Sequence, residues 1–187
     1  LSSTAEWTNS ASLGGGTVAS ALDKMVQSVN ILNANYEKDF AIHVNLINNN
    51  DRLIYTDENT DPFDNPTVGM QIIPLNTFAT NQRIGSRQYD YGHVFTIGCS
   101  DVGGVASLAG VCNSEIKGSA VTCWYTSDIA YVCNRIMCHE MGHQFSATHT
   151  FSNCNGNESG ASAWEPGSGT TIMSYGGLCG NGLNVIT

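Results

Sequence analysis

The sequence has 187 residues, which is enough for a single domain with a substantial buried core. Its formal net charge of -9 repels phosphate backbones and anionic membrane surfaces, so we expect no nucleic acid partner. No apolar run approaches the roughly 20 residues that span a bilayer, so we expect a soluble chain that does not insert into membranes. The first residues lack the basic and apolar segments of a signal peptide, so we expect the chain to be mature or trimmed.

Seven cysteines are many for a chain of this length and favour an oxidising compartment, hence a secreted protein with two or three disulfides. The odd number leaves at least one thiol unpaired, and the spacing leaves the pairing open. Cys133 and Cys138 point in different directions on a helix, so we expect them to have different partners or none. No cysteine pair has the two- to four-residue spacing of a zinc site.

The first element that we predict is an amphipathic helix of about four or five turns that begins near Thr17. Its apolar residues recur at helical spacing: Val18, Leu22, Met25, Val26, Val29 and Leu32. The stretch 40–47 then alternates apolar and polar residues, which predicts a strand with His43 facing outward.

An acidic stretch, TDENTDPFDNP, follows and is interrupted by prolines, so it is predicted to be a loop. Its clustered carboxylates suit calcium, but a solvated acidic loop is the commoner explanation. The next elements are a helix over 69–82, limited or broken by Pro74, a strand at YGHVFTIG, and a short strand in GGVASLAGVC.

A further helix is predicted from Ser127, because apolar residues recur at three- and four-residue steps after capping side chains. The apolar face ends at about His143, and Ser, Thr, Asn and Gly dominate afterwards. The last part of the chain is therefore predicted to be rich in loops.

The helix carries HEMGHQFSATH, which holds three of the five histidines. His139 and His143 are one turn apart, so both imidazoles can reach one zinc ion, and Glu140 beside them can act as general base toward water. His149 can join them only if the helix ends and the chain turns back. Three histidines leave one zinc position open, as in a catalytic site. By composition, this pattern has a chance expectation of about one in ten thousand in such a chain.

Glycine is usual at a turn of this kind, but Ser146 stands there. We predict either a positive φ at Ser146, at a cost of about 1 kcal/mol, or a turn of another geometry. His93, outside the cluster, is expected to be an ordinary structural histidine.

HEMGHQFSATH followed by TTIMSYGG resembles the metzincin zinc endopeptidases, and within them the reprolysin or adamalysin branch, particularly its secreted bacterial members. The resemblance implies an α/β (α+β) zincin fold, with a twisted mixed β-sheet and two long helices in an N-terminal lobe, a small loop-rich C-terminal lobe, and the active-site cleft between them. It implies one catalytic domain over 1–187, with the upper lobe at about 1–145 and the lower lobe at about 146–187.

By position, the resemblance implies that His139, His143 and His149 bind zinc and that Glu140 is the general base. It makes Met173 the residue of the Met-turn under the metal. Tyr175, two residues later, has the spacing of a tyrosine that hydrogen-bonds the transition state in related families. The alternative is that Tyr175 has an ordinary packing role. An edge strand that would bind an extended substrate comprises Gly104, Val105, Ala106, Ser107, Leu108, Ala109 and Gly110.

The termini depart from the family pattern, because relatives have a strand before the first long helix and a helix after the Met-turn. We expect the missing elements either to lie on a separately cleaved propeptide or terminal fragment, or to be absent from a smaller lobe. Two functions follow: a secreted zinc endopeptidase acting on proteins or peptides, or a zinc-stabilised binding module of the same fold that has lost catalysis. The intact Glu140 favours the peptidase.

Overall fold

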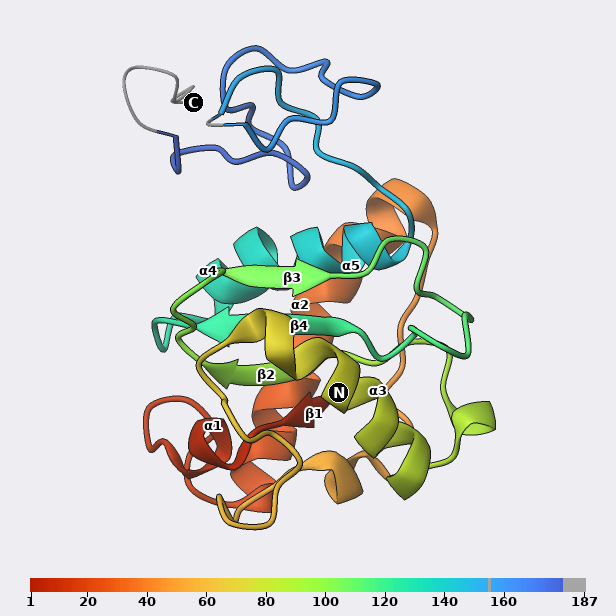
Figure 1. Cartoon of the computed structure of the whole chain (residues 1–187), viewed down its shortest axis with the longest axis vertical. Helices are drawn as coiled ribbons and strands as arrows, with labels where there is room; N and C mark the ends of the chain where they lie inside the picture. The colour runs from red at the N-terminus through yellow and green to blue at the C-terminus, as the bar shows by residue number, and fades with distance from the viewer. Residues whose placement is uncertain (155, 180–187) are drawn as a thin grey trace.

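The computed structural model describes residues 1–154 and 156–179 and has a mixed β-sheet at its centre (Figure 1). The strands are β1 (Ser2–Ser3), β2 (Val94–Ile97), β3 (Gly104–Ala106) and β4 (Ala120–Trp124), in the order β1-β2-β4-β3. β1, β2 and β4 are parallel, and β3 pairs antiparallel with β4 at the edge. The predicted α/β fold with a mixed sheet is confirmed.

Helices pack on both faces of the sheet because its buried strands present apolar side chains to each side. The helices are α1 (Ala5–Asn9), α2 (Val18–Phe40), α3 (Gly69–Arg83), α4 (Ile129–Val132) and α5 (Cys138–Gln144), with 3-10 turns η1 (Asn50–Leu53) and η2 (Ser86–Gln88). Phe95 and Trp124 pack with α2 and α5, whereas Val94 and Val121 pack with Ile72 of α3. Alternate residues of β2 and β4 thus supply two separate cores.

α3 matches its predicted bounds closely, whereas α2 begins where predicted but, at 23 residues, is longer than the four or five turns predicted. Thr17 caps α2 in a capping box with Ser20, at the predicted start. α3 continues through Pro74 to Arg83, so the proline does not break it. The helix from Asp128 contains a π-helical turn, η3 (Cys133–Met137), between α4 and α5.

The predicted strand at 40–47 is wrong. α2 extends to Phe40 and ends at Ala41, which adopts a left-handed conformation with φ 55°. The side chain of Asn33 then makes hydrogen bonds of 2.9 Å with both the N–H and the carbonyl of Val44. Because a helix side chain occupies these main-chain groups, the segment lies along α2 without joining the sheet.

Two strands had no counterpart in the prediction. β4 was not predicted, because all five of its residues are buried and no alternation with polar residues marks the strand. The N-terminal strand that we expected to be missing is present as the two-residue β1, which pairs with β2.

Two disulfides join Cys99 to Cys123 and Cys154 to Cys179, in agreement with the lower predicted number. Cys112 is free and exposed, while Cys133 and Cys138 are free and buried. Burial raises the pKa of Cys133 to about 11 and that of Cys138 to about 12, so both remain thiols at neutral pH.

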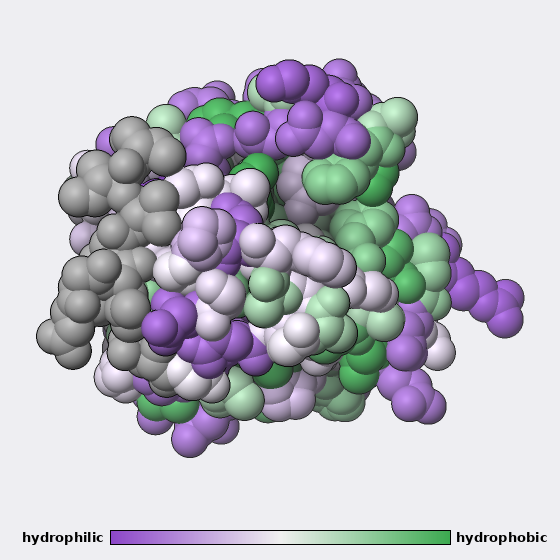
Figure 2. Space-filling model, turned by 90° about the horizontal axis from the view of Figure 1, so that it is seen from above, coloured by the Kyte–Doolittle hydropathy of each residue, from purple (hydrophilic) through white to green (hydrophobic). Residues whose placement is uncertain are grey.

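After Gln144 the described residues form no helix or strand, only an isolated bridge between Phe151 and Glu165. The segment lies above α5 and β3 in Figure 1 and packs around a small core of Phe151 and the Cys154–Cys179 disulfide. Figure 2 looks onto this end of the molecule and shows hydrophilic and hydrophobic residues intermixed, with hydrophobic ones gathered on one flank. The last eight residues of the predicted lower lobe, 180–187, lie outside the described residues.

Glu165 organises this irregular segment. Its carboxylate accepts hydrogen bonds from the N–H groups of Thr170 and Thr171 and from the Thr150 hydroxyl. Burial acts to raise the pKa of Glu165, but these hydrogen bonds outweigh it and lower the pKa to about 2. None of the described helices has the length and apolar character needed to cross a membrane.

Candidate metal centre

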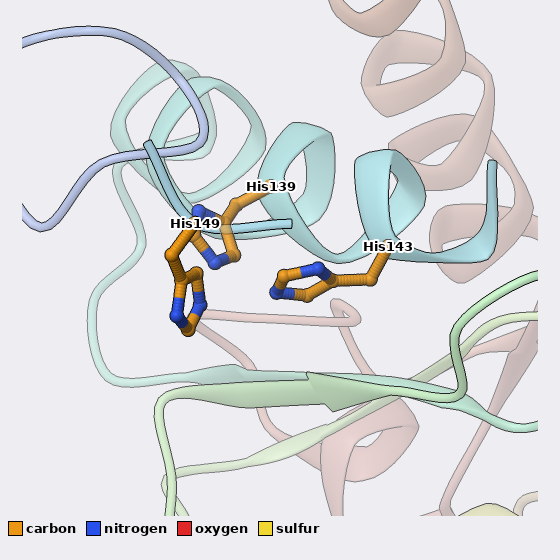
Figure 3. Close-up of side chains that lie close together, drawn as sticks. All are labelled: His139, His143 and His149. Atoms are coloured by element: carbon orange, nitrogen blue, oxygen red, sulfur yellow. The ribbon is translucent and has the colours of Figure 1, made fainter. Parts of the chain in front are cut away.

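Three histidines converge beneath α5. His139 and His143 project from α5, and His149 returns from the segment that follows (Figure 3). One ring nitrogen from each lies within 4.8 Å of the others. Their ring centroids are 4.7 to 5.2 Å apart. Among the described residues, this is the one group of three or more possible ligands that could hold a metal ion.

Each imidazole is oriented through its Nδ1 atom. His139 Nδ1 lies 2.7 Å from the Ile172 carbonyl, and His143 Nδ1 lies 2.7 Å from the Ala147 carbonyl. His149 Nδ1 lies 2.6 Å from the Asn157 carbonyl. Since a carbonyl can only accept, each Nδ1 carries the hydrogen and each Nε2 presents a lone pair.

The Nε2 atoms fit a zinc ion. His149 Nε2 is buried and has no hydrogen-bond partner among the described residues, which is costly for a polar atom unless a ligand binds it. Burial lowers the pKa of His139 to about 4 and also lowers the pKa of His143, so both imidazoles are neutral at physiological pH. Neutral imidazole is a preferred zinc ligand, and the donor set is that of an open three-histidine site.

The turn that brings His149 back depends on Ser146. Its φ is 75°, as the first of the two alternatives predicted. The Ser146 N–H bonds the His143 carbonyl at 2.8 Å, and the Ala147 N–H bonds the Gly142 carbonyl at 2.9 Å. These bonds end the helix and reverse the chain, so a serine supplies the left-handed residue that is usually glycine.

Glu140 lies on the adjacent side of α5, facing the edge of the sheet. The residue is 5% exposed, and no described residue makes a hydrogen bond to its carboxylate. A Cβ atom on Gly104 of β3 would lie 2.7 Å from Glu140 Oε1, so glycine is required for this close approach. Burial raises the pKa of Glu140 to about 8 in the absence of a metal ion.

Met173 and Tyr175 approach the histidines from the irregular segment. The Met173 sulfur lies directly against Gly142, between the two helical histidines in sequence. The Tyr175 ring centroid is 5.7 Å from that of His139 and 4.8 Å from that of His149. Burial raises the pKa of Tyr175, and the nearby Glu140 carboxylate raises it further, so the phenol stays protonated.

The predicted edge segment is shorter than expected. β3 ends at Ala106; the Ser107 N–H still bonds the Ser119 carbonyl at 2.9 Å, and the chain then turns at Leu108 and Ala109, where Ala109 has φ 56°. The turn is held to the helix, because the Ala109 N–H bonds the His143 carbonyl at 3.2 Å. Only Gly104, Val105 and Ala106 therefore form the strand.

Gln144 was not singled out by sequence reasoning. It is fully buried beside His143 and donates Nε2 to the Gly92 carbonyl at 3.0 Å and to the Lys117 carbonyl at 3.3 Å. The sequence could have identified Gln144 by its position, because it is a polar residue at the end of an apolar helical face. It ties the end of α5 to the segments that flank the sheet.

The remaining candidates are His93 and the acidic stretch 56–66, and neither belongs to a metal site formed by the described residues. His93 is buried and bonds Thr122 Oγ1 at 2.7 Å, which agrees with a structural role. The calcium suggestion is not supported: Asp57 bonds the Asn59 N–H and Asp61 bonds the N–H groups of Ala5 and Phe63, and the described carboxylates form no ligand cluster.

A comparison with protein families agrees with this geometry. Residues 2–182 match the family described as Metallo-peptidase family M12B Reprolysin-like. Among curated proteins, none matches the sequence significantly. The match spans nearly the whole chain and includes the three histidines, and the family is zinc-dependent. The chain therefore belongs to the reprolysin-like metallopeptidases of family M12B.

Proposed function

We propose that the protein is a secreted endopeptidase that hydrolyses peptide bonds in protein substrates, with one zinc ion held by His139, His143 and His149. The observation that carries the proposal is the convergence of three imidazoles with free Nε2 lone pairs beside Glu140. The Glu140 carboxylate is buried and accepts no hydrogen bond from a described residue. When bound, zinc would supply Lewis acidity that polarises a carbonyl group and makes water more acidic.

Glu140 is the general base in this proposal. A dication at the histidines would favour the ionised form and lower the pKa of Glu140 from its raised value. The carboxylate would then accept a proton from the attacking water and deliver it to the leaving amine. Its burial against Gly104 holds it in one place between the helix and β3.

Three further features support the reaction. The Tyr175 hydroxyl, protonated and close to His139 and His149, would donate a hydrogen bond to the developing oxyanion. The outer edge of β3, which no described strand pairs with, would bind an extended substrate through main-chain hydrogen bonds. Met173, packed on Gly142, would support the floor of the site as the Met-turn residue.

We treat the chain as one catalytic domain, with an upper lobe at about 1–145 and a lower lobe beyond it. The His139 Nδ1 bond to Ile172 joins the helix to the irregular segment and supports this arrangement. The two disulfides support an extracellular location.

The test combines metal analysis with proteolysis of casein. We expect one zinc per chain, loss of cleavage after chelation and recovery on adding zinc. Glu140→Ala should retain zinc and lose cleavage by about 100-fold or more. Glu115→Ala, an exposed glutamate whose side chain makes no described hydrogen bond, is the matched control and should remain active. Zinc binding without cleavage of any protein by the unmodified chain would instead favour the binding module.

A further inference from the structure

A pocket of about 530 Å³ lies beside the histidine site, between the helix and the irregular segment. Its walls include Gly103, Tyr125, Arg135, Ile136, Ser174 and Leu178. Ile172, whose carbonyl orients His139, also lines it. The pocket therefore shares a wall with the metal site without containing the histidines.

The pocket lies next to Glu140. A Cβ atom built on Gly104 would lie 2.7 Å from Glu140 Oε1 and 2.8 Å from Ile136 Cγ2. Ile136 and Glu140 thus meet at the start of β3, one helical turn apart. Since Ile136 and Gly103 also line the pocket, it begins immediately beyond the proposed general base.

The direction of β3 decides which part of a substrate reaches this pocket. β3 is paired antiparallel with β4, and its other edge is free among the described residues. A substrate that pairs antiparallel with this edge would run from the Ala106 end toward the Gly104 end. This step rests on the proposed function. Residues after the cleaved bond would then lie toward Gly103, at the pocket.

Arg135 is the one charged side chain among the described residues that line the pocket. It is exposed, and its Nη2 atom donates to the Gly176 carbonyl at 2.9 Å, which leaves other guanidinium N–H groups available. Glu165, behind the wall that Thr170 and Thr171 form, is already bonded to Thr150, Thr170 and Thr171. The pocket combines apolar walls from Ile136 and Leu178 with the Arg135 cation, which forms no salt bridge with a described residue.

In the proposed function this pocket receives the substrate side chain that follows the cleaved bond. We propose that Arg135 makes the pocket prefer a carboxylate there over the corresponding amide or a lysine. The methylene groups of glutamate would contact Ile136 and Leu178, and its carboxylate would accept from the guanidinium. Because Arg135 is exposed, solvent screens the interaction, and we expect a preference of about fivefold for glutamate over glutamine.

The experiment uses quenched fluorescent peptides that are identical except for Glu, Gln, Lys or Leu after the cleaved bond, with mass spectrometry of the products to identify that bond. We expect wild-type kcat/KM to be highest for the Glu peptide among the three polar ones, and the Glu-to-Gln ratio to fall as salt is raised. Arg135→Gln should bring that ratio to about one, because it removes the charge and keeps a polar side chain in the pocket. Arg135→Glu should favour the Lys peptide.

Arg87→Gln, which removes the same charge from an exposed residue of η2, is the matched control and should keep the wild-type ratio. Binding of the uncleaved peptides to zinc-loaded Glu140→Ala gives a second measurement that does not depend on turnover. Equal ratios in wild type and Arg135→Gln would overturn the proposal, as would an equal loss for every peptide, which would assign Arg135 only to holding Gly176. Absence of cleavage of all peptides and of casein would overturn the proposed function itself.

Discussion

The sulfur of Met173 lies directly against Gly142, so a methyl group at Gly142 would overlap it. Gly142→Ala would gain about 1 kcal/mol in helix propensity, whereas overpacking costs about 1–3 kcal/mol. We expect the clash to prevail, with a lower free energy of unfolding in urea and weaker zinc retention against a chelator. Gly160→Ala, where nothing lies within 4 Å of the added Cβ, should change neither, and equal effects at both positions would contradict this view of Met173.

Ser146 adopts φ 75°, which strains any residue with a Cβ atom. Ser146→Gly should relieve that strain and raise the free energy of unfolding by about 0.5–1 kcal/mol, with zinc and activity retained. Ser127→Gly, at an exposed position outside the positive-φ residues, should instead lower stability slightly. Thermal melts of the two variants would decide the matter, and destabilisation by Ser146→Gly would mean that the serine hydroxyl contributes more than the strain costs.

Tyr175→Phe separates the hydroxyl from the ring. The ring packs against His149 and Phe151 with centroids 4.8 and 4.7 Å apart, and phenylalanine should preserve this packing and the bound zinc. If the hydroxyl stabilises an oxyanion, kcat should fall by about tenfold or more while KM changes little. Unchanged kcat with intact zinc would leave Tyr175 a packing role only.

His93 should make stability depend on pH. Burial, with a smaller contribution from the Leu1 amino group, lowers the pKa of His93 to about 3. Between about pH 6.5 and 3 the unfolded chain binds this proton and the folded chain does not, so stability should fall as the pH falls through that window.

Urea denaturation of the metal-free protein at about pH 7.5 and pH 5 would measure the effect. His93→Gln should lose less stability between these two pH values than wild type, because it removes one buried titrating group. His139 and His143 have pKa values lowered in the same direction, so some pH dependence should persist. Identical pH dependence in both proteins would show that His93 is not held neutral.

The helices were the most predictable part of the fold. α2 begins at the predicted cap because Thr17 and the apolar spacing after it are local signals. The segment 41–47 alternates like a strand, yet Asn33 engages Val44 and holds the segment on α2. β4 had no local signal, because a central strand buried on both faces lacks polar alternation.

The sequence by itself determined the identities and spacing of His139, His143 and His149, the glutamate beside them and the need for a reversal at Ser146, since helical periodicity and turn chemistry act over a few residues. Only the tertiary structure decided what surrounds them. It orients the imidazole of His139 through the carbonyl of the distant residue Ile172, and it brings Gly104 into close contact with Glu140. It also places Arg135 in a pocket whose far wall begins 35 residues later at Thr170. Such contacts join segments far apart in the chain, and no short-range pattern in the sequence encodes them.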